Sequence, residues 1–201
     1  MSGHPGAPVT LGITGASGAP YAVRLLRALN DTATPTRLIV SSYGWRLLAE
    51  ESGIEGVEQL RAATGDWSRV DAYDALDRGA TPASGSAPSR GMVVCPCSMG
   101  TLASIAAGTS RNLVERAADV TLKERRPLVL VPRETPLSLI HLENMTRLTR
   151  AGATILPASP GFYSRPRSID ELVDFVVARI LDHLGVEHGI GRRWRSGEAT
   201  S

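Results

Sequence analysis

Residues 9–18 read VTLGITGASG and decide the fold of this chain. The first six are short, apolar and rich in β-branched side chains, which predicts a buried strand that ends at Gly15. Small residues at the following turn would let backbone N–H groups approach an anion at a helix N-terminus. Ser17 stands where its hydroxyl could cap that helix or bind a ligand, and both interpretations remain open.

The alternation of apolar strand and amphipathic helix continues along the chain. Further strands are predicted at 36–40, 91–95, 128–131 and 154–156, and helices at 21–29, 43–51, 101–107, 113–122, 136–151 and 169–184. Residues 52–80 are polar and weakly patterned, which allows helix or loop. Alternating strands and helices predict an α/β fold with one doubly wound, mostly parallel sheet, Rossmann- or flavodoxin-like, with helices on both faces. The apolar strands suit a sheet covered on both sides.

Composition and length indicate one globular domain, expected at residues 8–188, with flexible tails at 1–7 and 189–201. A net charge of +2 gives no reason to expect nucleic acid or a membrane surface as a partner. The N-terminus has no signal-peptide pattern, and no apolar run is long enough to span a membrane. The two cysteines form C-x-C, and the four histidines show no metal-ligand spacing. A cytoplasmic protein without a metal site is expected.

In doubly wound folds, ligands bind beyond the carboxyl ends of the strands. The loops at 15–18, 41–42, 96–100, 132–135 and 157–165 are therefore the candidate ligand loops. The dinucleotide fingerprint G-x-G-x-x-G is absent, because the glycines of the first turn are each three residues apart. Ser41 and Ser42 occupy the place where an acidic residue would bind the ribose of NAD. This favours a mononucleotide, and FMN is the natural candidate.

The later loops carry groups suited to phosphate and proton chemistry. Ser98 could cap a helix or bind a ligand, while Cys97 is expected to be a small buried residue because no histidine lies on a neighbouring loop. Arg133 could clamp a phosphate, and Glu134 beside it could move a proton. An ion pair between these two is the competing interpretation. Tyr163 could donate to a phosphate or pack at a subunit contact.

Longer motifs resemble the UbiX family of flavin prenyltransferases over about residues 8 to 186, apart from much of 52–80. They are GITGASGAPYAVRLL, PASGS, MVVCPCSMGTLASIAAG, NLVERAADVTLKERRPLVLVPRETP, IHLENM, ILPASPGFY and LVDFVVARIL. The run from Asn112 to Pro136 is the most specific of these. The resemblance implies a reaction in which a dimethylallyl group is joined to N5 of reduced FMN and then closes a ring onto C6, without a metal.

The resemblance also implies roles for individual residues. FMN contacts are expected at Gly15, Ala16, Ser17, Ser41, Ser98, Met99, Gly100, Thr101 and Arg133. Dimethylallyl phosphate is expected to bind Arg116, Lys123, Tyr163 and Arg179. Catalytic roles are expected for Ser17, Glu51 and Glu134. The implied partners are a UbiD-type decarboxylase that uses the product and further copies of the chain, a dodecamer in the family.

Three other functions would suit parts of this sequence. An FMN-dependent decarboxylase of the cysteine decarboxylase type shares the fold, but it needs a histidine early in the chain and a PASANT-like loop, where this chain has PCSMGT. A short-chain NAD(P) dehydrogenase needs Tyr-x-x-x-Lys, and no tyrosine here has a lysine four residues on. A non-catalytic flavin carrier would leave Lys123, Arg133 and Arg179 without a purpose.

Overall fold

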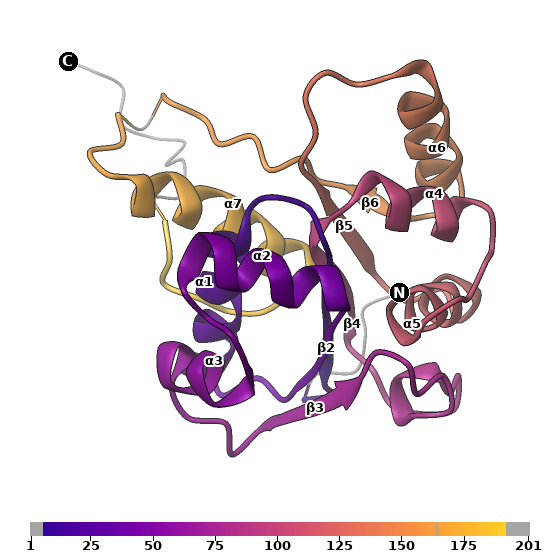
Figure 1. The fold of residues 1–201 in the computed structure, drawn as a ribbon, viewed down its shortest axis with the longest axis horizontal. Helices are drawn as coiled ribbons and strands as arrows, with labels where there is room; N and C mark the ends of the chain where they lie inside the picture. The colour runs from indigo at the N-terminus through magenta and orange to yellow at the C-terminus, as the bar shows by residue number, and fades with distance from the viewer. Residues whose placement is uncertain (1–5, 164, 192–201) are drawn as a thin grey trace.

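A computed structural model describes residues 6–163 and 165–191 of the chain (Figure 1). Within these residues, six strands form one sheet in which every neighbouring pair is parallel. They are β1 (Val9–Ile13), β2 (Thr36–Val40), β3 (Val70–Asp74), β4 (Gly91–Cys97), β5 (Leu128–Pro132) and β6 (Thr154–Ile155). Their order, β3-β2-β1-β4-β5-β6, is that of a Rossmann-type sheet, so the predicted doubly wound α/β fold is confirmed.

Helices cover both faces of the sheet (Figure 1). They are α1 (Ala19–Asp31), α2 (Ser42–Ser52), α3 (Val57–Thr64), α4 (Met99–Ala106), α5 (Leu113–Lys123), α6 (Leu139–Arg150) and α7 (Ile169–His183). One buried cluster joins α1, α3 and α7 to the sheet, and a second joins α4 and α5 to its other face. None of the helices in the described part of the chain is long and apolar enough to cross a membrane.

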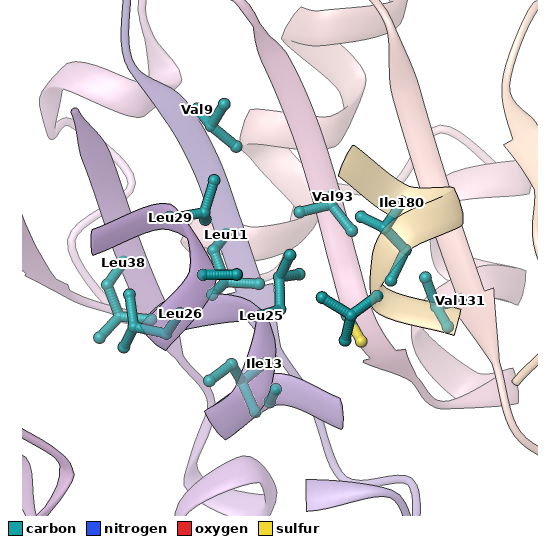
Figure 2. Packing of buried hydrophobic residues seen from close by; sticks show 14 of the residues in the cluster. Val9, Leu11, Ile13, Leu25, Leu26, Leu29, Leu38, Val93, Val131 and Ile180 are labelled. Atoms are coloured by element: carbon teal, nitrogen blue, oxygen red, sulfur yellow. The ribbon is translucent and has the colours of Figure 1, made fainter. Parts of the chain in front are cut away.

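The first of these clusters shows how the central strands divide their side chains between the two faces. Figure 2 shows Leu11 and Val93 of the sheet against Leu25 of α1 and Ile180 of α7, all buried. The next residue along β4, Val94, belongs instead to the cluster on the opposite face. Because successive strand residues point to opposite faces, both must be apolar in a doubly covered sheet, and this is why the sequence pattern is continuous rather than alternating.

Residues 52–80, which the sequence left undecided, contain α3 and β3. β3 is an edge strand whose aspartates, Asp71 and Asp74, are exposed, so it lacks the apolar run of the central strands. The helix predicted at 136–151 begins only at Leu139, because Ser138 caps it by accepting from the His141 N–H.

The two predicted tails lie mostly outside the described residues. Of the first, residues 6–7 are described, and Ala7 is buried. Of the second, residues 189–191 are described, and Ile190 packs against the cluster that contains α7.

The strand order also locates the ligand crevice. The chain leaves β1 through α1 toward β2, and it leaves β4 through α4 and α5 toward β5, on the opposite side. In such sheets the crevice opens beyond the carboxyl ends of the two strands at which the direction reverses. The loops after Ile13 and Cys97 therefore frame the candidate site.

Candidate functional site

The loop after β1 lies tightly against the start of α2. A Cβ atom added to Gly15 would lie 2.4 Å from the Cβ of Tyr43, so only glycine fits there. Gly18, at the N-cap of α1, has a φ of 128°, a conformation that other residues rarely adopt. Gly15 thus lets the loop pack directly against α2, and Gly18 supplies the positive φ with which α1 begins.

Glu51, near the end of α2, binds the backbone at the start of α1. The N–H groups of Gly18 and Ala19 both donate to its Oε2 at 2.8 Å, and the Ser17 hydroxyl also hydrogen-bonds to this carboxylate. Burial by itself would raise the pKa of Glu51. The hydrogen bonds from the loop and the charge of Arg133 outweigh burial, so this pKa lies below its ordinary value.

Arg133 reaches the same place from the end of β5. Its Nε donates to the backbone oxygen of Ser17 at 3.1 Å. Ser17, Glu51 and Arg133, here called the crevice cluster, thus come from three different elements and meet at the carboxyl edge of the sheet. The cluster combines a hydroxyl, an ionised carboxylate and a guanidinium, which together can orient a polar ligand and hold a phosphate.

The serines after β2 and β4 cap helices. Ser41 Oγ accepts from the Gly44 N–H at 3.0 Å, and Ser98 Oγ accepts from the Thr101 N–H at 3.2 Å. The Ser98 hydroxyl also donates to Thr101 Oγ1 at 3.0 Å. The capping interpretation of Ser98 is therefore confirmed, and Ser41, which the sequence predicted only as a ligand group, is also a helix cap. The other N–H groups in the first turn of α4 point toward the helix N-terminus, at the carboxyl edge of the sheet, where they can serve a ligand oxygen.

Met99 and Gly100 form the first turn of α4 and differ in exposure. The Met99 side chain is buried in the second core cluster, whereas Gly100 is exposed. Ala16, in the first loop, is buried as well. At Met99 and Ala16 the backbone, rather than the side chain, is the part that can reach a ligand.

Glu134 is exposed beside the crevice cluster. Its Oε1 accepts from the Thr135 N–H at 3.1 Å, while Arg133 bonds to Ser17. The structure therefore does not pair Arg133 with Glu134, and the ion-pair interpretation that the sequence left open is wrong. Within the part of the chain that the structure describes, the Glu134 carboxylate accepts only from its own turn, and its exposure leaves it accessible to a proton donor or acceptor.

Among the described residues, neither Lys123 nor Arg116 forms a hydrogen bond or ion pair with the crevice cluster. Lys123 pairs with Glu124 at the end of α5. Because β5 begins shortly afterwards, this pair lies at the amino edge of the sheet. Arg116 pairs with Asp119 at 2.9 Å on the same helix.

Two further predicted substrate residues lie at α7, each with a partner on that helix. The Tyr163 ring packs edge-on against Phe175, with ring centroids 5.8 Å apart. Arg179 follows one turn later on that face and pairs with Asp182 at 3.1 Å.

The two cysteines are packing residues. Both are free thiols and fully buried at the end of β4. Burial raises the pKa of the Cys97 thiol to about 12, so a thiolate nucleophile does not form there. The prediction that Cys97 is a small buried residue is confirmed.

Thr14 was missed by the sequence analysis. It connects the loop after β1 to the loop after β4 through its side chain. A hydroxyl-bearing residue at the end of an apolar strand was the only signal, and it is a weak one.

Comparison with known proteins identifies the family. Residues 3–181 match the Flavoprotein family. The flavin prenyltransferase UbiX of Halalkalibacterium halodurans is 50% identical over 191 residues, covering 92% of each chain. UbiX of Pseudomonas aeruginosa is 48% identical, covering 92% of this chain and 93% of that one. The chain belongs to the UbiX family of flavin prenyltransferases.

Solved structures of UbiX proteins superimpose on nearly the whole chain. AnUbiX (PadA1), in complex with FMN and dimethylallyl pyrophosphate, is 41% identical, with a TM-score of 0.88 over 96% of this chain and 99% of that one. A protein from Escherichia coli O157:H7, described as a dodecameric FMN-dependent UbiX-like decarboxylase, is 45% identical, with a TM-score of 0.87 over 94% of this chain and 100% of that one.

More distant likenesses extend only to the fold. An FMN-dependent cysteine decarboxylase, TvaF, is 16% identical with a TM-score of 0.60. At this identity the likeness shows the fold alone, so it gives no support to the cysteine decarboxylase alternative.

Two UbiX motifs lie together at the amino edge of the sheet. The PASGS segment forms a tight turn over the end of α5, and Arg126 donates to the Gly85 carbonyl oxygen at 2.6 Å. A Cβ at Gly85 would meet Glu124, the partner of Lys123, at 2.4 Å. The motifs PASGS and KERRP thus form one surface that includes Lys123, on the far side of the sheet from the crevice cluster.

Proposed function

We propose that this chain joins a dimethylallyl group from dimethylallyl phosphate to reduced FMN, first at N5 and then by ring closure at C6. The observation that carries the proposal is the crevice cluster. It gathers a hydroxyl, a carboxylate and a guanidinium at the switch point of a sheet that belongs to the UbiX family. The protein is an enzyme of this family, and its acceptor is the flavin rather than a protein or nucleic acid.

The residues of the crevice fit FMN. Glycine at position 15 lets the first loop pack directly against Tyr43 of α2, and Arg133 supplies a cation for the phosphate of FMN. The helix N-termini capped by Ser41 and Ser98 add N–H groups aimed at the carboxyl edge of the sheet. The FMN-binding set predicted from the resemblance is retained as part of this proposal: Gly15, Ala16, Ser17, Ser41, Ser98, Met99, Gly100, Thr101 and Arg133.

The remaining residues serve the leaving phosphate and the protons. Ionisation of an allylic phosphate leaves a cation and a phosphate anion, and fixed positive groups stabilise that charge separation. Lys123, Arg116 and Arg179 supply such charge, and the Tyr163 hydroxyl can donate a hydrogen bond. Glu134 transfers the proton.

Ser17, held by Glu51, presents its hydroxyl to the flavin. Because the pKa of Glu51 is lowered, its carboxylate remains an acceptor for this hydroxyl at neutral pH.

The proposal is tested by the reaction itself. Purified protein is incubated with FMN, a reductant and dimethylallyl phosphate, and the released flavin is analysed by mass spectrometry. We expect a mass gain equal to one dimethylallyl group less a proton. Carbon dioxide release from a cysteine-terminated peptide, with no change in flavin mass, would instead support the decarboxylase alternative.

We predict that prenyl transfer needs no divalent metal. The cationic side chains named above take the part that magnesium has for many allylic phosphates. Turnover after dialysis against EDTA should stay within about twofold of the untreated enzyme, because EDTA then removes no ion that takes part in the reaction. Restoration of a lost activity by Mg²⁺ would show that the prediction is wrong.

Arg179→Ala should raise the KM for dimethylallyl phosphate about tenfold or more and leave FMN affinity nearly unchanged. The reason is that Arg179 lies on α7, one turn after the Phe175 that packs against Tyr163, whereas the residues of the crevice cluster come from other elements. Initial rates and an FMN titration separate the two effects. Arg46→Ala, which removes an exposed arginine paired with Glu50, is the matched control. Equal loss of substrate and FMN affinity would indicate a structural role for Arg179.

The proposed active form is a homo-oligomer, a dodecamer like the E. coli relative. Large apolar side chains lie exposed on two segments of the surface, with Leu139 70%, Ile140 67% and Phe162 69% exposed. Such patches are typical of protein interfaces. Light scattering that finds an active monomer would contradict this proposal.

A UbiD-type decarboxylase is the proposed consumer of the product. Its apo form, mixed with this enzyme and its substrates, should gain activity, whereas FMN alone should give none. The cytoplasm is the proposed compartment, since the two free cysteines suit a reducing environment. Cell fractionation tests that location.

A further inference from the structure

Thr14 makes a hydrogen-bonded bridge across the crevice. It directly follows β1 and is 2% exposed. Its hydroxyl donates to the Pro96 carbonyl oxygen at 2.9 Å and accepts from the Ser98 N–H at 2.8 Å. Its own backbone N–H also donates to the Pro96 oxygen, at 3.2 Å. One residue thus makes three hydrogen bonds between the end of β1 and the end of β4.

The bridge lies where the backbone ladder ends. The pairing of β1 with β4 runs from Val9 opposite Gly91 to Gly12 opposite Val94. Beyond that point Pro96 has no N–H to contribute. A threonine hydroxyl can donate and accept at the same time. The Thr14 hydroxyl therefore continues the hydrogen bonding between β1 and β4 beyond the end of their backbone ladder.

Both ends of the bridge belong to ligand loops. Gly15, the next residue along the chain, begins the loop that contains Ser17. Ser98 is the N-cap of α4 and holds Thr101. A change in the Thr14 bonds therefore changes the separation between the first loop and the start of α4, even though Thr14 itself is buried beneath the crevice.

We propose that Thr14 is a positioning residue for FMN, which sets the distance between the 15–18 loop and the N-terminus of α4 so that both bind one flavin. The inference rests on FMN binding in the crevice, which is part of the proposed function, but it does not depend on prenyl transfer. Binding measurements can therefore test it even if the chemistry were different.

Thr14→Val keeps the shape of the side chain and removes its hydroxyl. The Ser98 N–H then loses its partner in a partly buried place, and the two loops are free to separate. FMN affinity, measured by quenching of flavin fluorescence, should fall about tenfold or more. The visible absorption band of the bound flavin should also shift. Thr14→Ser keeps the hydroxyl and should bind FMN within about threefold of the wild type.

Thr36→Val is the matched control. Thr36 is 1% exposed at the first residue of β2, on the opposite edge of the sheet, and its hydroxyl donates to the Thr34 oxygen at 3.0 Å. Both valine variants should lower the thermal unfolding temperature of the apo protein, but only Thr14→Val should weaken FMN binding. Unchanged FMN affinity in Thr14→Val, or an equal loss in Thr36→Val, would overturn the proposal.

A second pair of variants applies if Thr14→Val does not fold. Thr14→Ser and Thr14→Cys both lose the methyl group and differ only in hydroxyl against thiol, which is a much weaker hydrogen-bonding group. The cysteine variant should bind FMN more weakly than the serine variant by about tenfold. Equal affinities would contradict the positioning role. The two proposals can fail separately. If the wild type showed no prenyl transfer but Thr14→Val still bound FMN more weakly than the wild type, the proposed reaction would be refuted and this inference would stand.

Discussion

Glu134→Gln should lower turnover by ~10²–10⁴-fold while FMN stays bound, because glutamine keeps the size and hydrogen bonding of the side chain but carries no transferable proton. The structure sharpens this expectation. Glu134 bonds the Thr135 N–H and does not pair with Arg133, so the substitution removes no ion pair from the crevice cluster. Stopped-flow absorbance and mass spectrometry of quenched samples should reveal an N5-alkylated flavin that accumulates before ring closure.

The control is Glu58→Gln, which neutralises an exposed glutamate that faces Arg61 on α3. It should leave turnover within about twofold of the wild type, as surface ion pairs contribute little. If Glu134→Gln turned over as fast as Glu58→Gln, Glu134 would have no role in proton transfer. If it lost FMN as well as turnover, the residue would instead be part of the binding site.

The central sheet was predictable because its strands are apolar on both faces. β2 spans Thr36–Val40 as the pattern predicts, and β1, β4 and β5 differ from their predicted bounds by one or two residues. The edge strand β3 could not be recognised, since Asp71, Ala72 and Asp74 are exposed and only Val70 and Tyr73 pack against the two core clusters. α3 is a single short helix of eight residues, too short for its apolar spacing to stand out.

The site was predictable only as far as topology determines it. The rule that ligands bind at carboxyl ends selected Ser17 and Arg133, and these do meet. Glu51 came from the family resemblance alone, because its place depends on how α2 crosses the edge of the sheet. Spacing in the sequence cannot give that direction. Thr14 was missed for a similar reason, since its side chain hydrogen-bonds to Pro96, a residue 82 positions away in the sequence.

The positions of Lys123 and the crevice cluster lead to the second large effect. Lys123 ends α5 before β5 begins, whereas Arg133 directly follows β5. β5 is five residues long, so the two ends are separated by about 16 Å along the strand. A lysine side chain cannot span that distance to the crevice of its own chain. If Lys123 acts on the substrate phosphate, it acts in the crevice of a neighbouring chain.

Mixed oligomers test this arrangement directly. Ser17→Ala and Lys123→Ala should each lower activity by ~10²-fold or more when present in every chain. Co-expressed with different tags and purified through both, they form oligomers in which some sites take an intact Ser17 from one chain and an intact Lys123 from another. Random assembly makes about one quarter of the sites intact. Activity should therefore rise from about one hundredth to about one quarter of the wild-type value.

The control pair is Ser17→Ala with Arg133→Ala. Arg133 binds the backbone of Ser17 within one chain, so no mixed site can have both residues intact. That mixture should remain as inactive as the single variants, although light scattering should show oligomers of the same size. Recovery in the Ser17 and Lys123 mixture alone requires a site built from two chains. Equal inactivity of both mixtures would mean that Lys123 does not serve a neighbour, and the shared site would then be abandoned.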